Sequence, residues 1–177
     1  MKPARAALNT RNNPYRNFIE GEDPIRVLSA TYRKISKSLE GLTARQITRR
    51  LNKDKWSISE IIGHLADEEL VFSVRSRWMA FQENPVLVSF DQEAWAHGHA
   101  REKEPVADTL ERFRVLRQSQ LRLFRSIPQE DFSRFGTHDE YGKIVFGDYI
   151  AWVAGHDLNH LVQITDLRAK ILEREGR

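Results

Sequence analysis

The sequence predicts an all-α protein folded as a four-helix bundle. The first observation is that several long segments repeat apolar side chains every three or four residues, which places them on one face of a helix. The second is that capping residues and prolines stand at the ends of these segments. The third is that 177 residues suffice for one domain with a sizeable core and are few for two.

Composition narrows the class of protein further. The chain has no cysteine, which excludes disulfides, thiolate metal ligands and a cysteine nucleophile, and makes the cytoplasm the expected compartment. No secretion signal or membrane-spanning stretch is visible, so we expect a soluble protein that does not contact membranes. The formal net charge is +3, but basic residues alternate with acidic ones. Solvated helix faces explain this pattern better than nucleic-acid binding.

The elements follow in order along the chain. Residues 1–22 contain Asn, Pro and Gly without periodicity and are predicted to form an N-terminal arm or partner-contacting tail, while residues 23–177 form the bundle domain. The first long helix is predicted from Asp23-Pro24, a cap followed by a first-turn proline, to Gly41. Thr43 is predicted to cap a short turn that ends by Arg50.

The second long helix is predicted from Ser57 to Phe81, because Ser57 and Glu60 have capping-box spacing. Its predicted core stripe is Ile58, Ile61, His64, Leu65, Phe72 and Met79. Glu68 and Arg75 project close to the direction of His64. Charged groups on an inward face are costly unless they serve each other or a ligand. The alternative is that both lie at the edge of the stripe and reach solvent.

Residues 82–104 form a connection long enough to predict a lid or pocket wall, with Asp91 and Trp95 at the pocket entrance. His97 and His99 are two residues apart in a loop, which fixes no metal geometry, and their role is left open. The third helix is predicted from Val106 to Ile127, with Leu110, Phe113, Leu116, Leu121 and Phe124 as its core.

Residues 129–146 are predicted to be irregular, either a small hairpin or coil, and the role of His138 within them is left open. The last helix is predicted from Gly147 or Asp148 to Glu173. The connections are long, so neighbours in the sequence need not be neighbours in the bundle.

The last helix carries His156 and His160, one turn apart on its apolar face. Each ring could simply find a hydrogen-bond partner in the core. The pair could also hold one metal ion, since imidazole is the commonest nitrogen ligand. His64 is the natural third ligand, because it lies on the core face of another long helix.

These residues resemble the DinB/YfiT-like family of metalloenzymes along most of the chain. The resemblance is carried by residues 56–69 around His64, by Arg75, by Phe90-Asp91 to Trp95, and by residues 155–164 around His156 and His160. It implies a bundle in up-down-down-up order, often dimeric. It also implies a site for nickel, zinc or a similar divalent ion with His64, His156 and His160 as ligands. Some members are thiol-dependent S-transferases or isomerases and others look like hydrolases.

The spacing His156-Asp-x-x-His160 also invites comparison with the HExxH metalloproteases. That motif needs its acid to reach a metal-bound water, and Asp157 is one methylene shorter than glutamate. The third protease ligand lies well downstream of the motif, whereas this sequence ends at Arg177. The protease reading is therefore rejected.

The leading hypothesis is a metal-dependent enzyme acting on a small molecule, in which the ion lowers the pKa of a bound water or thiol. Thiol transfer with a low-molecular-weight thiol ranks first and hydrolysis second. The alternative from another class is a stress-linked binding bundle with a structural metal, whose fourth ligand would be Glu68.

Further candidates surround the three histidines. Glu68, Arg75 and Asp91 are the candidates for the catalytic centre, and Arg75 could anchor a substrate carboxylate or pair with Glu68. Carboxylates often accept the free ring N–H of a ligand histidine. Those placed for this role are Asp67, Glu69 and Asp157, with surface charge as the alternative.

Overall fold

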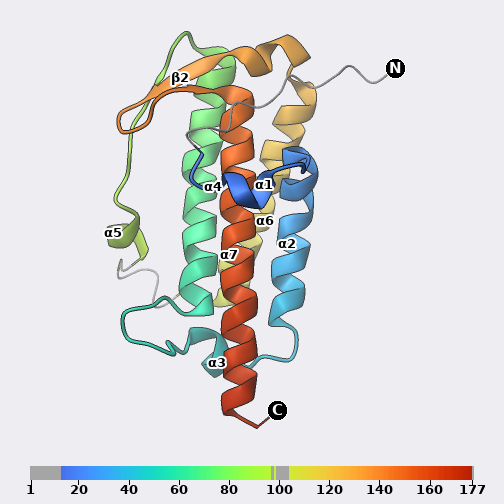
Figure 1. The fold of residues 1–177 in the computed structure, drawn as a ribbon, viewed down its shortest axis with the longest axis vertical. Coiled ribbons are helices and arrows are strands. Elements are labelled where there is room, and N and C mark those ends of the chain that lie inside the picture. The colour runs from blue at the N-terminus through green and yellow to red at the C-terminus, as the bar shows by residue number, and fades with distance from the viewer. Residues whose placement is uncertain (1–12, 97, 99–103, 177) are drawn as a thin grey trace.

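The computed structural model describes residues 13–96, 98 and 104–176. Its body is a bundle of four long helices: α2 (Pro24–Leu39), α4 (Ile58–Phe81), α6 (Val106–Ser126) and α7 (Phe146–Arg174). Figure 1 shows α2 and α7 running in one direction and α4 and α6 in the other. The predicted four-helix bundle with up-down-down-up order is confirmed.

Side-chain caps fix where these helices begin. Asp23 accepts hydrogen bonds from the backbone N–H groups of Ile25 and Arg26, and Pro24 occupies the first helical position. Ser57 and Glu60 form a reciprocal capping box at the start of α4. Thr43 and Gln46 form another at α3 (Ala44–Thr48). The predicted start of each of these helices is confirmed.

The bundle places parallel helices beside each other. The most extensive packing joins α2 to α7 and α4 to α6, and each of these pairs runs in one direction. A short turn can join only antiparallel neighbours, because the chain must otherwise return to the starting end. The connection after α4 therefore passes along the bundle to reach the start of α6 (Figure 1). It contains strand β1 (Val86–Leu87) and helix α5 (Gln92–Ala96).

Two groups of buried apolar side chains fill the bundle. One is centred on Phe72 of α4 and Phe146 of α7, and the other on Phe113 of α6 and Ile164 of α7. The predicted α4 core stripe is fully buried. On α6, Leu110 and Leu116 are both half-buried, and Leu110 still packs against the second group. The prediction is wrong for Leu116, which joins neither group, because Arg117 and Gln120 occupy the inward positions.

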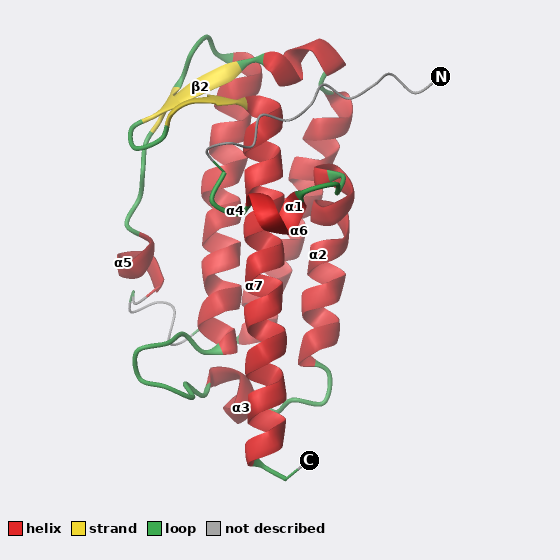
Figure 2. Ribbon diagram, viewed as in Figure 1, coloured by secondary structure: helices red, strands yellow, loops and turns green. Residues whose placement is uncertain are grey.

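A small three-stranded sheet caps one end of the bundle, as Figure 2 shows. Strands β2 (Phe135–His138) and β3 (Gly142–Val145) form an antiparallel hairpin, and β1 pairs with β2 in parallel. The hairpin confirms one of the two predicted alternatives. The sequence predicted residues 82–104 only as a long connection, and the structure forms β1 within it. Gly136 permits this pairing, since a Cβ there would lie 2.9 Å from the Leu87 side chain.

The described N-terminal residues pack against α7. They include the short helix α1 (Arg16–Ile19), whose Ile19 is buried. Tyr15 lies directly over Gly155, where a Cβ would come within 2.8 Å of the Tyr15 backbone oxygen. Gly155 is therefore the position that lets this segment approach α7 beside His156. The remaining short helix is η2 (Gln129–Ser133), a 3₁₀ turn between α6 and β2.

Among the described residues no helix is both long and apolar enough to cross a membrane. The predicted residues His97 and His99, like residues 1–12, lie outside the described part of the chain.

Candidate metal centre and adjoining cavity

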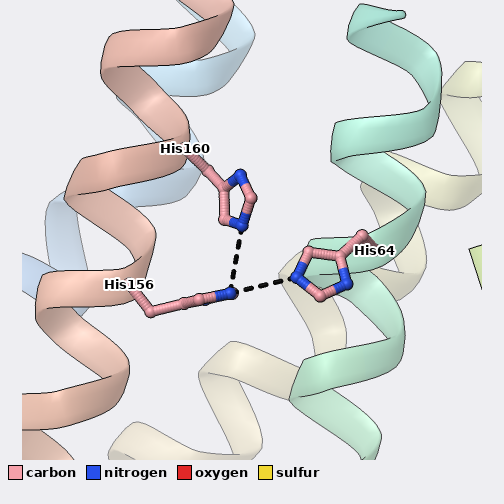
Figure 3. Close-up of side chains that lie close together, drawn as sticks. All are labelled: His64, His156 and His160. Atoms are coloured by element: carbon pink, nitrogen blue, oxygen red, sulfur yellow. Dashed lines mark hydrogen bonds between the residues drawn. The ribbon is translucent and has the colours of Figure 1, made fainter. Parts of the chain in front are cut away.

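Three imidazoles meet between α4 and α7, as Figure 3 shows. His64 projects from α4, and His156 and His160 project from α7 toward it. The Nε2 atom of His156 lies 3.0 Å from Nε2 of His64 and 3.0 Å from Nε2 of His160. All three side chains are buried in the bundle. The structure thus brings together the three histidines that the sequence singled out.

The contacts among these nitrogens fit a metal ion better than they fit hydrogen bonding. A neutral imidazole carries one ring proton, so a proton on His156 Nε2 can lie along only one of its two contacts. Without that proton, Nε2 has a single lone pair, which can likewise accept along only one of the two contacts. Nitrogens bound to one tetrahedral zinc ion at about 2.05 Å are about 3.3 Å apart, close to the observed separations. Among the described residues these three form the one His, Cys, Asp or Glu group compact enough to hold an ion.

Neighbouring side chains fix the orientation of the rings. His160 Nδ1 lies 3.0 Å from Gln163 Oε1, an atom that can only accept, so Nδ1 carries the proton and Nε2 keeps its lone pair. Trp56 stacks on His160 with an interplanar angle of 15° and approaches His64 with ring centroids 5.0 Å apart. Tyr15 contacts the His156 ring edge-on at 5.1 Å. The imidazoles are therefore held in place before any ion binds.

Burial in the bundle keeps the rings of His156 and His160 uncharged. Burial, followed by the neighbouring His160 and His64, lowers the pKa of His156 well below its ordinary value. Burial also lowers the pKa of His160, partly offset by the hydrogen bond to Gln163. Neutral imidazole is the form that ligates metal ions. Both residues thus present lone pairs at neutral pH.

A cavity of about 340 Å³ reaches His156. Its wall comes from the N-terminal segment, α4, residues 89–93, the β2–β3 hairpin and α7. The lining residues are Pro14, Tyr15, Glu68, Arg75, Ser89, Phe90, Asp91, Gln92, Glu93, His138, Glu140, Tyr141, Ile144, Tyr149, Trp152, Val153 and His156. The volume suits a small molecule and lies at the low end of ligand sites.

Glu68, Arg75 and Tyr149 are neighbouring polar residues of this cavity, and Arg75 and Tyr149 are buried while Glu68 is half-buried. Burial raises the pKa of Glu68 to about 7, although the charge of Arg75 opposes this shift. Burial likewise raises the pKa of Tyr149 to about 12. Arg75 donates to the Tyr149 hydroxyl at 3.4 Å and to the backbone oxygen of Val88. Glu68 can therefore hold or release a proton near neutral pH.

The connection before α6 does form part of the cavity wall, as predicted. Asp91 lines the cavity, and its carboxylate also accepts the backbone N–H of Ala94 at the start of α5. Trp95 is 43% exposed and packs against Phe90 outside the lining, so its predicted place at the entrance is wrong. Ser89 donates its hydroxyl proton to Asp139, which ties this connection to the β2–β3 hairpin.

A buried ionic network lies beside the histidines. Arg117 of α6 is 2% exposed and donates to Glu69 at 2.8 Å and to Asp157 at 2.7 Å. Asp67 pairs with Arg112 at 2.8 Å. The surface-charge alternative is wrong for all three acids, because each is buried. Their recorded partners are arginines, so the network links α4, α6 and α7 around the histidines.

Several residues at the site were not singled out from the sequence as functional. Gln163 follows His160 by three residues and Tyr149 precedes His156 by seven, so helical spacing placed both on the relevant face. Trp56 directly precedes Ser57, the cap of α4, and Arg117 lies between the predicted core residues Leu116 and Leu121 of α6. Tyr15 carried no signal, because its contact with His156 depends on how the N-terminal segment folds back.

Comparison with known proteins agrees with this site. A protein of Oceanobacillus iheyensis named "Putative metal-dependent hydrolase OB0782" is 27% identical over 135 residues, covering 76% of this chain and 78% of that protein. "Putative metal-dependent hydrolase GK0616" of Geobacillus kaustophilus is 23% identical, covering 96% of this chain and 97% of that protein.

Among solved structures, YfiT from Bacillus subtilis superimposes with a TM-score of 0.78 at 20% identity, over 99% of this chain and 94% of that one. That protein is described as a probable metal-dependent hydrolase with an unusual four-helix bundle topology. At this level of identity, the comparison shows that the two proteins share a fold. The model of the DinB superfamily matches residues 28–164, from the first turns of α2 through His156 and His160 of α7. The chain therefore belongs to the DinB superfamily.

Proposed function

We propose that this protein is a metal-dependent enzyme in which His64, His156 and His160 hold a divalent ion such as nickel, zinc or a similar metal. The observation that carries the proposal is the convergence of three Nε2 atoms at 3.0 Å contacts beside a cavity of about 340 Å³. When bound, the ion would supply Lewis-acid activation of a water or a thiol. The names of the two relatives described above support metal dependence.

The adjoining cavity favours an enzyme over a structural metal site. A structural site is normally closed by a fourth protein ligand, for which Glu68 was the candidate. Glu68 lines the cavity and does not belong to the compact ligand group formed by the three histidines in the described chain. Three ligands beside a cavity are the usual arrangement of a catalytic ion.

The chain's own residues then bind the substrate and move protons. The cavity binds a small molecule beside His156, with Tyr15 and Trp152 contributing apolar surface. The Glu68 carboxyl, with a pKa of about 7, takes a proton from the nucleophile and returns it to the leaving group. Arg75 orients the substrate from a fixed position. Asp91 stands at the exposed rim and also caps α5.

Among possible reactions, thiol transfer ranks first and hydrolysis second. The chain has no cysteine, so a sulfur nucleophile would come from a low-molecular-weight thiol as cosubstrate. The resemblance to thiol-dependent S-transferases supports this order, and the names of the relatives support the hydrolase.

The experiment offers metal-loaded protein a chloronitrobenzene with bacillithiol, glutathione or cysteine, and separately offers esters and amides with water alone. Metal-dependent turnover only with a thiol is expected. Turnover only with water would replace the transferase by the hydrolase. Full metal occupancy with no turnover in either assay would contradict the enzyme and favour a binding module. The first measurement is metal content, which should approach one ion per chain in protein purified without a tag.

Assembly and location complete the proposal: a cytoplasmic homodimer. Leu70, Val74 and Phe81 of α4 support the dimer, because they are exposed apolar residues at spacings of four and seven on one helix face. Light scattering coupled to size-exclusion chromatography tests it. A monomer at micromolar concentration would contradict the dimer without affecting the metal site.

A further inference from the structure

A second set of buried polar side chains lines the cavity, apart from the three imidazoles. Arg75 of α4 is 7% exposed, His138 of β2 is 6% exposed, and Tyr149 of α7 is 4% exposed. Each comes from a different element, and each presents a polar group to the same space. A few polar groups that converge on one otherwise largely apolar cavity are the usual arrangement of a polar subsite, so this convergence points to a ligand group.

Arg75 is fixed in position with donors to spare. One NH group donates to the Tyr149 hydroxyl and another to the backbone oxygen of Val88. A guanidinium has five N–H donors, so these two bonds orient it without exhausting it. The Val88 carbonyl belongs to the connection that forms β1, which means that the small sheet itself positions the guanidinium.

The same sheet brings His138 to Arg75. Leu87, the residue before Val88, is the cross-strand partner of His138 in the β1–β2 ladder. The backbone N–H of Glu140 donates to His138 Nδ1 at 3.2 Å, so the ring proton lies on Nε2. Among the described residues no hydrogen bond is recorded for that Nε2 atom. His138 therefore presents a free N–H donor.

Asp139 Oδ1 also lies 3.1 Å from His138 Nδ1, but in the described part of the chain the hydrogen bond formed at Nδ1 is the one that the Glu140 backbone N–H donates to it. Burial and then Arg75 lower the pKa of His138, so the ring is neutral at pH 7. Asp139 is engaged instead by the Ser89 backbone N–H and hydroxyl. The donor assignment for His138 Nε2 stands.

We propose that Arg75, His138 and Tyr149 form a subsite for a carboxylate group of the substrate. Two free N–H groups of a guanidinium match the two oxygens of a carboxylate, and a carboxylate only accepts hydrogen bonds. The Nε2–H of His138 and the O–H of Tyr149 supply further donors. Phe90, Tyr141 and Trp152 line the same cavity and suit an aromatic or alkyl body attached to that carboxylate.

The acidic residues of the cavity limit the ligand to one such group. Asp91, Glu93 and Glu140 are exposed, so they form the rim and not the inner wall. Glu68 is the carboxyl whose charge is coupled to Arg75. A second negative charge on the ligand would meet these acids, so the subsite selects monocarboxylates. This inference relies on the proposed function only in treating the cavity as the substrate site.

The test compares benzoate with benzamide, which match in size and shape and differ in charge. Isothermal titration calorimetry on metal-loaded protein should show at least about 10-fold tighter binding of benzoate. Arg75→Met should abolish this preference at unchanged metal content. Arg77→Met is the matched control, because Arg77 lies on the same helix but bonds Gln120 and Ser119 outside the cavity.

His138 requires its own pair of variants, because a substitution could disturb the hairpin. His138→Phe should weaken benzoate binding about 10-fold, whereas His138→Gln, which keeps an N–H donor, should stay within about 3-fold of wild type. Lys143→Gln, which removes an exposed charge from the same hairpin, should change nothing. Circular dichroism and metal content should show that each of these variants is folded and binds metal as the wild type does.

Benzoate binding that survives both Arg75→Met and His138→Phe would put the carboxylate on the ion and overturn the proposal. Equal affinities for benzoate and benzamide in the wild type would also overturn it. Failure of metal-dependent turnover would overturn the proposed function alone, since the titrations measure binding and not reaction.

Discussion

The side-chain oxygen of Gln163 lies 3.0 Å from Nδ1 of His160, three residues before it on α7. The amide oxygen can only accept, so this contact fixes the proton on Nδ1 and aims the Nε2 lone pair at the other two imidazoles. A residue that touches neither ion nor substrate thereby sets the tautomer of a metal ligand.

Replacing Gln163 tests this relationship directly. Gln163→Leu should weaken Zn²⁺ or Ni²⁺ binding about 10-fold to 100-fold, because His160 can then rotate or adopt the other tautomer. Gln163→Glu, which keeps an acceptor at the same place, should lose much less. Competition with a chromogenic chelator gives the affinity. Equal affinities for the leucine variant and the wild type would show that Gln163 does not orient the ligand.

Removing a ligand should separate metal binding from folding. We expect His160→Ala to lose the ion or bind it at least about 10-fold more weakly and to abolish turnover. Its far-UV circular dichroism should match that of the wild type, because two apolar clusters fill the bundle without any metal. Elemental analysis and a thermal melt provide the measurements. An unfolded variant would mean that the ion has a structural role.

The buried arginine of α6 should matter more for stability than any arginine on the surface. Arg117→Met leaves Glu69 and Asp157 buried without their cation and should lower the free energy of unfolding by about 3–5 kcal/mol. Arg114→Met, on the same helix in an exposed pair with Glu111, should be indistinguishable from wild type. Urea unfolding of both variants provides the comparison. A small loss in Arg117→Met would mean that water reaches the carboxylates.

The capping box of α4 should give a defined pH dependence. Burial opposes ionisation of Glu60, but hydrogen bonds from Arg50 and Ser57 lower its pKa to about 2 from 4.5. A carboxyl with a lowered folded-state pKa stabilises the fold above about pH 4.5, and this stabilisation disappears as the pH falls through 2.

Glu60→Gln keeps the capping geometry and removes the charge. It should cost about 1 kcal/mol at pH 7, a value kept small because Arg50 is partly solvated. The difference between the two proteins in urea unfolding should shrink from pH 4.5 downward and vanish below pH 2. A constant difference across that range would trace the effect to the hydrogen bonds of the box and not to its charge.

The helices and the three histidines could be predicted because their signals are local. Ser57 with Glu60 and Asp23 with Pro24 determine helix starts within four residues of sequence, and His156 with His160 needs only one turn. His64 joined them through apolar periodicity, which placed it on an inward face. The resemblance of the motifs to a known family then supplied the order of the helices.

Strand β1, the ion pairs of Arg117 and the place of His138 depend on contacts between residues far apart in the sequence, so they could not be predicted. Strand β1 has two residues and its partner β2 lies about fifty residues further on, so no alternating pattern marks it. The ion pairs of Arg117 join three helices, and a charged residue beside Leu116 looks like surface on a helical wheel. His138 could be assigned no role until the sheet placed it beside Arg75, because pairing across strands is a tertiary property.

The close packing of Tyr15 against Gly155 affects how the protein should be prepared for metal measurements. Pro14 and Tyr15 line the cavity, so whatever is fused ahead of residue 1 is attached a dozen residues from it. A polyhistidine tag at that end would add imidazoles to the same chain, and they would bind added metal themselves. The last turns of α7 lie at the opposite end of the bundle from the sheet (Figure 1). A tag after the end of α7, or a tag that is cleaved off, leaves the measured number of ions per chain attributable to the histidine site.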